Sequence, residues 1–458
     1  MRVCHTVLAG FDDPNLVSCA GLVPVMALAE RAGLHDLAAT HVRVPGSAGA
    51  HADMKVSALV AGMVAGADTI DAMDLLRHGG MDRILTPGRA PSTLGTFLRS
   101  FSFGHVRQLD AVSSRFLVNL ASLSPLLVGA DQVAYVDIDD TIKATYGYQK
   151  QGAGYGYSKV KGLNALLGIV STPLSAPVIA ATRLRRGPTN SAKGAARLVA
   201  EALVTARKAG ATGQVTVRAD SAYYNHDVIA AARTGGARFS ITARMDPAVT
   251  RAITQIPDDA WVGIKYPHAI YDEQEERWVS DAEVAEIDFT AFTSRRQSEH
   301  ISARLIVRRV KRLNPKTVPA GQGDLFSVWR HHAVFTDSHE VMLAAEATHR
   351  DHAIVEKVIA ELKDGPLAHL PSGLFTANAA WLVLAAISFN LTRAAGTLAS
   401  RFHARATTAT IRTHLIAVPA RIARSARRLH LHLPVRWPWE TAWHAMFTAA
   451  TGPPARAT

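Results

Sequence analysis

The chain has 458 residues, with 50 Lys and Arg against 38 Asp and Glu, which gives a formal net charge of +12. This length is too great for one ordinary hydrophobic core, so we expect two to four domains. The 48 % hydrophobic content excludes a disordered chain, and two cysteines exclude a disulfide framework and a thiolate zinc site. The positive charge favours a polyanionic partner such as nucleic acid, although a basic protein with a solvated surface would have the same balance.

No secretory signal is apparent near the N-terminus, because Asp12, Asp13 and Pro14 come before any long apolar run. The longest apolar stretch, residues 379–388, is shorter than the ~20 residues that a membrane-spanning helix needs. We therefore expect a cytoplasmic protein without a membrane partner.

Residues 1–125 are predicted to form a helical N-terminal domain. Apolar residues recur at helical spacing in three runs: 22–32, 56–65 and 70–76. Gly33 follows the first run, where a helix commonly ends. The first run and residues 34–40 fit a helix-turn-helix that binds DNA ends, and they fit simple antiparallel helix packing as well.

From residue 126 the pattern changes to that of an α/β layer. The β-branched runs 133–139 and 166–170 predict strands. A helix, a strand, a helix and a strand are predicted to follow, at 191–209, 214–219, 224–234 and 237–242. This order is typical of an α/β core, to which we assign residues 126–245 as the first part.

The rest of the chain is predicted to contain a β-rich insertion, a second part of the core and a tail. Residues 246–340 carry alternating strand patterns and three tryptophans, Trp261, Trp278 and Trp329. Helical patterns return in residues 341–395. Residues 396–458 are rich in arginine and are predicted to be a basic helical tail. Within it, Arg421, Arg424 and Arg428 recur three and four residues apart and would line one helix face, where phosphate contact is preferred over a solvated surface.

Three carboxylates are distinguished by their settings. Asp139 and Asp220 each end an apolar predicted strand, and Glu356 lies on a predicted helix. Oxygen ligands at strand ends, completed by one from a helix, suit a pair of Mg²⁺ ions that hold a phosphodiester. Side chains alternate along a strand, so Asp137 shares a face with Asp139 and is the second choice for the first ligand, whereas Asp140 faces away.

Residues 137–141 also fit the DxDxT pattern of haloacid-dehalogenase-type phosphatases. Asp137 would then be the nucleophile and Asp139 the general acid. That interpretation requires a later acidic pair introduced by Gly-Asp, but Asp220 is followed by Ser-Ala-Tyr-Tyr. It also leaves Glu356 and the net charge without a role, so the metal-dependent interpretation is preferred.

Taken together, the acidic segments resemble the DDE transposases of bacterial insertion sequences. The resemblance is closest to the thirteen-eighty family, within the group related to insertion sequence four, and covers roughly residues 130–395. The motifs that carry it are Asp-Ile-Asp-Asp-Thr at 137–141, Val-Arg-Ala-Asp-Ser-Ala-Tyr-Tyr at 217–224, and Glu356 with Lys363. This chain departs from the family where His349 and His352 replace the usual Tyr and Arg.

The resemblance implies an α/β fold in which an antiparallel β insertion interrupts a ribonuclease-H-like core, with helical N- and C-terminal regions. It implies that Asp139, Asp220 and Glu356 are the catalytic residues and bind two Mg²⁺ ions, for which Mn²⁺ can substitute. The residues expected to contact DNA phosphate are Lys363, His352, His349 and Arg350. Weaker site candidates are Asp137, Trp329, Arg424 and Arg428.

The function implied by the resemblance is DNA transposition, by cutting and joining phosphodiesters at insertion-sequence ends. The partners would be the terminal inverted repeats and target DNA, with a homodimer in the synaptic complex and a nucleoid-associated location in the cytoplasm. The alternative is a transposase-derived DNA-binding protein without cleavage activity, for which His349 and His352 are the only indication.

Overall fold

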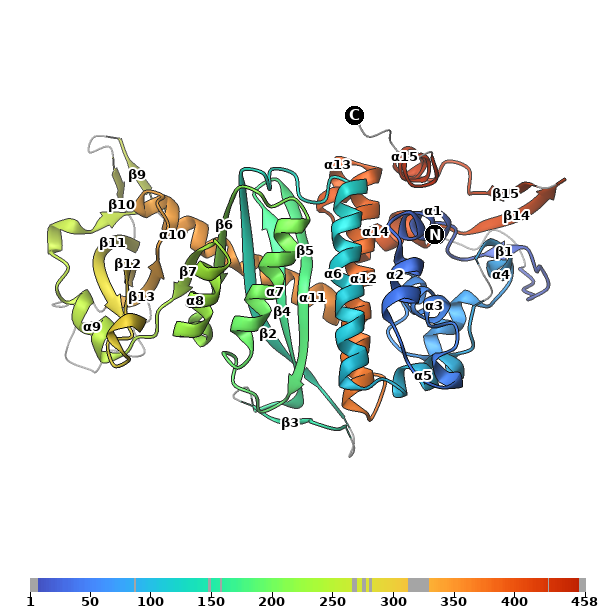
Figure 1. Cartoon of the computed structure of the whole chain (residues 1–458). Helices are drawn as coiled ribbons and strands as arrows, with labels where there is room; N and C mark the ends of the chain where they lie inside the picture. The colour runs from blue at the N-terminus through green and yellow to red at the C-terminus, as the bar shows by residue number, and fades with distance from the viewer. Residues whose placement is uncertain are drawn as a thin grey trace. The chain divides into compact units, whose positions relative to one another are not determined.

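The computed structural model describes residues 7–85, 88–146, 150–156, 159–265, 270–273, 277–279, 282–311, 329–426 and 428–452 (Figure 1). The chain forms two compact units. Unit 1 comprises Met1–Leu126, Thr145–Gly152 and Ala360–Thr458, and unit 2 comprises Leu127–Ala144 and Ala153–Ile359. The N-terminal helices and the C-terminal 99 residues, 360–458, therefore belong to one unit.

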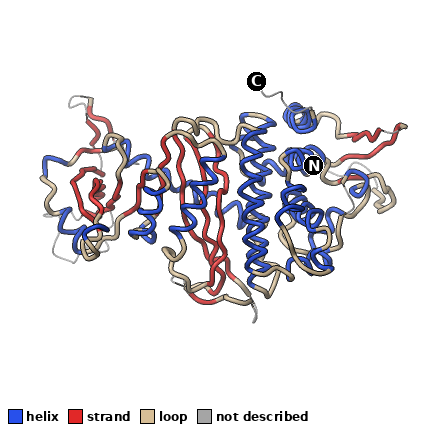
Figure 2. The backbone as a smooth tube through the Cα atoms, viewed as in Figure 1, coloured by secondary structure: helices blue, strands red, loops and turns tan. Residues whose placement is uncertain are grey.

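Unit 1 is mainly helical, as Figure 2 shows. Its α-helices are α1 (Leu22–Arg31), α2 (Leu34–His41), α3 (Ala52–Ala65), α4 (Met81–Ile84), α5 (Pro91–Arg99), α6 (Phe103–Leu123), α12 (Phe375–Ala399), α13 (Arg401–Arg405), α14 (Thr408–Ile411) and α15 (Glu440–Thr451). The long helix α12 contacts α1, α3, α5, α6 and α15, so it forms the centre of the unit.

Helix α12 extends well beyond the apolar stretch at 379–388. It has 25 residues, and its buried residues include polar ones such as Asn378, Asn390 and Arg393. A search for apolar residues alone therefore finds only part of the helix. Among the described helices it alone is long and apolar enough to cross a membrane, and 89 % of its most apolar window is buried inside the structure. Neighbouring helices of unit 1 account for that burial.

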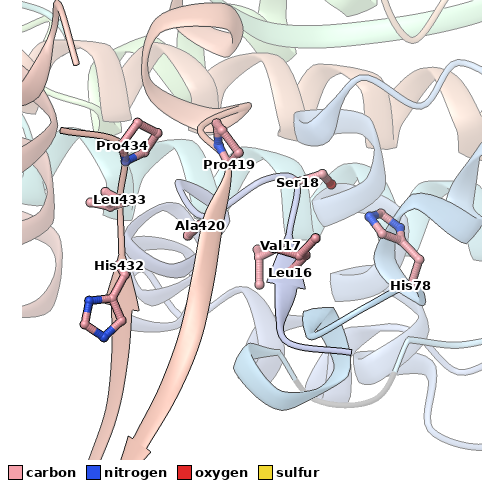
Figure 3. A pocket seen from close by; sticks show the side chains of 9 residues that line it. All are labelled: Leu16, Val17, Ser18, His78, Pro419, Ala420, His432, Leu433 and Pro434. Carbon is pink, nitrogen blue, oxygen red and sulfur yellow. The ribbon is translucent and has the colours of Figure 1, made fainter. Parts of the chain in front are cut away.

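The tail of unit 1 differs from the predicted basic helical tail. Residues 420–432 form an antiparallel hairpin of β14 (Ala420–Ser425) and β15 (Arg428–His432), and β1 (Leu16–Val17) pairs with β14. The reason is that burial alternates from one residue to the next, as it does along a strand: Ala420 and Ile422 are buried, and Arg421 between them is exposed. A shallow pocket of about 400 Å³ lies beside this sheet, and Figure 3 shows His78 and His432 among the side chains that line it.

Unit 2 is built on a mixed sheet with the strand order β3-β4-β2-β6-β7-β13-β12-β11-β8, and β5 pairs with β4. Its strands are β2 (Val133–Ala144), β3 (Gly154–Tyr155), β4 (Lys161–Thr172), β5 (Ser175–Arg186), β6 (Gln214–Ala219), β7 (Arg238–Thr242), β8 (Val262–Gly263), β11 (Ala282–Ala291), β12 (Ile301–Lys311) and β13 (Trp329–Thr336). A separate pair consists of β9 (Ile270–Asp272) and β10 (Arg277–Val279). This arrangement confirms a mixed α/β class.

Two parallel pairings lie in the middle of this sheet. Strand β2 runs parallel to β6, and β6 runs parallel to β7. Helices α7 (Ala195–Lys208) and α8 (His226–Thr234) contact each other, and α7 packs on β2, β4 and β5. The remaining helices are α9 (Pro247–Ile253), α10 (Met342–Arg350) and α11 (Ile354–Lys363), which follows the 3₁₀ turn η7 (Asp351–Ala353).

Candidate active site

Asp139 and Asp220 lie at matching positions on neighbouring parallel strands. In the β2–β6 pairing, Asp137 is opposite Arg218 and Ile138 is opposite Ala219. The next residue along each strand is an aspartate, so the register brings Asp139 and Asp220 side by side where β6 ends. Neighbouring strands lie about 4.8 Å apart, which is close enough for two carboxylates to share a cation.

The surroundings of this pair disfavour the charged form of both carboxylates. Burial raises the pKa of Asp139 to about 7, and repulsion from Asp220 and Asp140 adds to the effect of burial. The Asp140 backbone N–H donates to Asp139 Oδ1 at 2.7 Å, which offsets only part of this shift. Among the residues that the structure describes, neither Asp139 nor Asp220 has an ion-pair partner from Lys or Arg.

Asp220 caps the short 3₁₀ turn η3 (Ser221–Tyr223) and keeps an exposed side chain. Its carboxylate accepts a hydrogen bond from the Ala222 backbone N–H at 2.9 Å. Partial burial by the surrounding protein still raises the pKa of Asp220, and the Asp140 carboxylate raises it further. The two aspartates thus share an environment that disfavours two negative charges.

The carboxylate of Asp137 takes part in a buried ion pair. The Arg218 guanidinium donates to both carboxylate oxygens of Asp137, from Nε at 2.6 Å and from Nη2 at 2.8 Å. Burial alone would raise the pKa of Asp137, but Arg218 and a hydrogen bond from His352 hold it below its usual value. Asp137 is therefore held in a buried ion pair two residues before Asp139, and its place as second choice for the first ligand stays a prediction.

Asp140 points to the other face of β2, as the strand alternation predicted. Asn164 on β4 donates to its Oδ2 at 3.0 Å, and Arg185 on β5 forms an ion pair with it. Arg185 Nη1 also donates to the carbonyls of Ser191 and Lys193, each at 2.8 Å. These contacts tie β2, β4 and β5 to the loop that precedes α7.

Glu356 lies in the first turn of α11 with an exposed side chain. Among the described residues, no group of three His, Cys, Asp or Glu side chains has the geometry to hold a metal ion. The structure therefore brings Asp139 and Asp220 together and does not bring Glu356 into a metal-binding group with them. His352, four residues before Glu356, does contact the sheet, because its Nδ1 lies 3.1 Å from Asp137 Oδ1.

His349, which was predicted to contact DNA phosphate, is buried in the structure. The ring is buried, with Nδ1 2.9 Å from Ser240 Oγ and Nε2 2.9 Å from Thr242 Oγ1 on β7. Both ring nitrogens are thus occupied within the protein. Burial lowers the pKa of His349 to about 3, so the ring is neutral near pH 7.

Replacing His349 with Gln should make the protein less sensitive to acid. Because the pKa is lowered from 6.5 to about 3 on folding, the unfolded chain binds the proton first and stability falls as the pH drops below 6.5. Between pH 7 and pH 4 the wild type should lose about 3 kcal/mol more than His349→Gln. Urea unfolding at both pH values measures this. His78→Gln, at an exposed histidine, should behave as the wild type, and equal losses in all three proteins would contradict the prediction.

The other residues predicted to contact phosphate, Arg350, His352 and Lys363, each have different surroundings. Arg350 Nε pairs with the buried Glu346 at 2.9 Å. His352 is held by Asp137, which leaves it part of the same buried network. Lys363 is half-buried at the end of α11 and belongs to unit 1, whereas the carboxylates belong to unit 2.

Trp329 is neither a core residue nor an open stacking surface. The guanidinium carbon of Arg309 lies 4.6 Å from the centre of its ring and 4.1 Å from that of Trp261, so one arginine contacts both tryptophans. Glu283 pairs with the same arginine at 2.5 Å. The side chain of Trp278 lies outside the described residues. Arg424 and Arg428 lie on the hairpin of unit 1 and not on a helix.

Sequence reasoning missed the residues that support the site. Arg218 carries the most informative signal, because a charged residue inside the apolar run Val217–Ala219 requires a buried partner. Asn164 and Arg185 gave no such signal, since their common partner Asp140 becomes apparent only from the pairing of β2, β4 and β5.

A family model described as Transposase DDE domain group 1 matches residues 3–451. The chain belongs to this family of DDE transposases. DDE transposases act on DNA and generally use a divalent metal ion, so the predicted class of DDE transposases and the DNA partner are confirmed.

Among solved structures, the chain is similar to a piggyBac transposase in a synaptic complex with hairpin DNA, determined by cryo-EM. The sequence identity is 10 % and the TM-score is 0.40, over 88 % of this chain and 79 % of that chain. No curated protein matches the chain in sequence.

Proposed function

We propose that this transposase cuts and joins phosphodiesters at the ends of an insertion sequence, with Asp139, Asp220 and Glu356 as its catalytic carboxylates. The observation that carries the proposal is the Asp139–Asp220 pair. Two aspartates lie side by side on parallel strands, without an ion-pair partner among the described residues, in a chain of the DDE family.

The residues at this position fit a divalent cation. Carboxylate oxygens are the ligands that Mg²⁺ and Mn²⁺ prefer. Burial and mutual repulsion raise the pKa of Asp139, and a bound cation would remove that penalty. Bound there, the ion would supply a nucleophilic water at neutral pH and stabilise the charge on the leaving oxygen.

Glu356 would complete the set from the helix. His352 contacts Asp137 on the sheet, and a residue four positions later lies on the same helix face. That face of η7 and α11 therefore carries both side chains. Within the sheet, the Arg218–Asp137 pair holds β2 and β6 in register, so the two aspartates keep their spacing while DNA binds.

We further propose that unit 2 contains a ribonuclease-H-like core. In such a core the first Asp lies on the central strand and the second at the end of a neighbouring strand. Strand β2 lies between β4 and β6 and carries Asp139, and β6 ends one residue before Asp220. The antiparallel strands β8, β11, β12 and β13 would then be the insertion that separates Asp220 from Glu356.

The motifs at 137–141 and 217–224, with Glu356 and Lys363, support a place in the thirteen-eighty family of insertion sequences. The substrates would be that element's terminal inverted repeats and target DNA. Joining two ends requires at least two protomers, so we propose a homodimer at synapsis. Its location would be the cytoplasm, in association with the nucleoid.

A cleavage assay tests the function. Supercoiled plasmid should carry the inverted repeats found just outside the coding region. Incubated with the full-length chain, it should be nicked at the repeat ends in Mg²⁺ or Mn²⁺ and remain intact in EDTA. If the protein binds the repeats but does not nick them in either metal, the alternative is favoured, namely a transposase-derived DNA-binding protein. That alternative draws on the histidines at 349 and 352, which replace the family's Tyr and Arg.

A further inference from the structure

The β14–β15 hairpin of unit 1 has two chemically different faces. Partners across an antiparallel pair share a face, and here Ile422 is opposite Leu431 whereas Arg421 is opposite His432. The first face also carries Ala420 and is buried or half-buried as far as Ile422 and Leu431, whereas the next pair towards the tip, Arg424 and Leu429, is exposed. The second face is exposed except at the half-buried Ala423, with Ala423 opposite His430 and Ser425 opposite Arg428.

The second face and the exposed tip, to which Arg424 belongs from the first face, form a basic surface. We call it the basic ribbon, and it consists of Arg421, Arg424, Arg428, His430 and His432. The sequence contains no Asp or Glu from residue 365 to residue 439, so neither strand brings an acid to it. Asp13 pairs with Arg421 at 3.0 Å, and among the described residues no ion pair involves Arg424 or Arg428.

The base of the ribbon is fixed and its tip extends beyond the third strand. Strand β1 pairs only with Ala420 and Arg421, and the Ile422 N–H donates to the Asn15 carbonyl at 2.8 Å. Figure 1 shows β14 and β15 continuing past β1 as a two-stranded ribbon. Strands rise ~3.4 Å per residue, so the basic side chains from Arg421 to the tip are spread over roughly 14 Å.

We propose that the basic ribbon contacts the phosphate backbone of duplex DNA, with Arg424 and Arg428 at the tip as direct phosphate contacts. The inference rests on the proposed function, since the partner is the DNA on which the transposase acts. Duplex DNA carries a charge every ~1.7 Å along its axis, and its major groove admits a two-stranded β-ribbon. An exposed arginine fork without a protein carboxylate matches a phosphate, and a prepaired ribbon loses little entropy on binding.

The test is the salt dependence of DNA binding by Arg424→Ala/Arg428→Ala in the full-length chain. Binding to a random-sequence 30-base-pair duplex is followed by fluorescence anisotropy between 50 and 200 mM NaCl. Each lost phosphate contact lowers the slope of log K against log salt by about 0.9. The slope should therefore fall by about 1.8, which corresponds to about 60-fold weaker binding at 100 mM salt.

Matched variants test whether a change in the slope comes from the arginines at the tip. Arg99→Ala/Arg115→Ala removes the same charge from exposed helix positions of unit 1 and should leave the slope unchanged. Arg424→Lys/Arg428→Lys keeps the charge and should retain most of the slope. If the tip variant and the helix control have the same slope, the inference is wrong, and it is equally wrong if the wild type does not bind the duplex.

The plasmid cleavage assay separates this inference from the proposed function. A slope that depends on the tip arginines, in a chain that does not cut DNA in Mg²⁺ or Mn²⁺, would support the ribbon and contradict the cleavage activity. Cleavage at the repeats with an unchanged slope would contradict the ribbon alone.

Discussion

Replacing Asp139 with Asn should reduce DNA cleavage by at least about 10³-fold and leave DNA binding intact. Metal-ion stabilisation of a phosphoryl transition state contributes several kcal/mol, and each 1.36 kcal/mol is a factor of ten in rate. An amide keeps the shape of the side chain but removes the charge that would hold the cation. Asp220→Asn should have the same effect, because the two carboxylates lie side by side on β2 and β6.

The same substitution should stabilise the metal-free protein at alkaline pH. Burial and like charges raise the pKa of Asp139 from 3.8 to about 7. The folded protein therefore holds a proton that the unfolded chain has released, and stability falls as the pH rises from 3.8 to 7. At pH 8 the full penalty is present, so Asp139→Asn should be more stable than the wild type by up to roughly 4 kcal/mol.

Plasmid nicking and thermal unfolding at pH 8, with and without Mg²⁺, measure the two effects together. Magnesium should raise the melting temperature of the wild type and have little effect on that of Asp139→Asn, since the variant lacks the ligand. Asp131→Asn is the control, because Asp131 is exposed just before β2 and should change neither property. A variant that still nicks DNA at the wild-type rate would remove Asp139 from the catalytic set.

The carboxylate pair could be predicted because each aspartate ends an apolar run. A run of buried residues closed by an acid identifies the strand in both cases, and β6 ends at Ala219 as the sequence predicts, whereas β2 continues beyond Asp139 to Ala144. The pairing of those strands depends on contacts between residues 81 positions apart in the chain, which local patterns do not contain. Only the register shows that Asp137 is opposite Arg218, with which it forms a buried ion pair.

The hairpin and the central helix show why local patterns fail elsewhere. Arg421, Arg424 and Arg428 fit a helical period, but the buried residues Ala420 and Ile422 follow a period of two, and burial decides the structure. Helix α12 includes the buried polar residues Asn378 and Arg393, which bind partners outside the helix. Glu361, for instance, pairs with Arg393 at 2.6 Å. The roles of polar residues depend on partners from distant segments, as they do for His349.

Replacing Arg218 with Met should destabilise unit 2 more than any other single change considered for the carboxylate site. Arg218 is 1 % exposed and Asp137 is 0 % exposed, so the substitution would leave a carboxylate buried without its cation. Breaking a buried pair by removal of one partner costs about 3–5 kcal/mol. The guanidinium also donates to the Thr348 carbonyl at 2.6 Å and lies 4.0 Å from the Tyr135 ring centre, and both contacts would be lost.

A double variant distinguishes loss of charge pairing from loss of packing. Replacing a whole buried ion pair with apolar residues of similar volume is often nearly neutral, so Asp137→Leu/Arg218→Met should recover most of the stability lost in Arg218→Met. The control is Arg197→Met, which removes the exposed Arg197–Glu201 pair on α7 and should cost less than about 1 kcal/mol. Urea unfolding at pH 7 measures all three variants.

The position of this ion pair links stability to catalysis. Asp137 and Arg218 lie two residues before Asp139 and Asp220 on the same two strands, so a change in their pairing would alter the spacing of the carboxylates. The double variant should therefore remain folded and yet cleave DNA more slowly than the wild type, because no charge pair then fixes the register at that point. If it cleaves at the wild-type rate, packing alone positions the carboxylates. If Arg218→Met is no less stable than Arg197→Met, the buried pair contributes nothing beyond a surface contact.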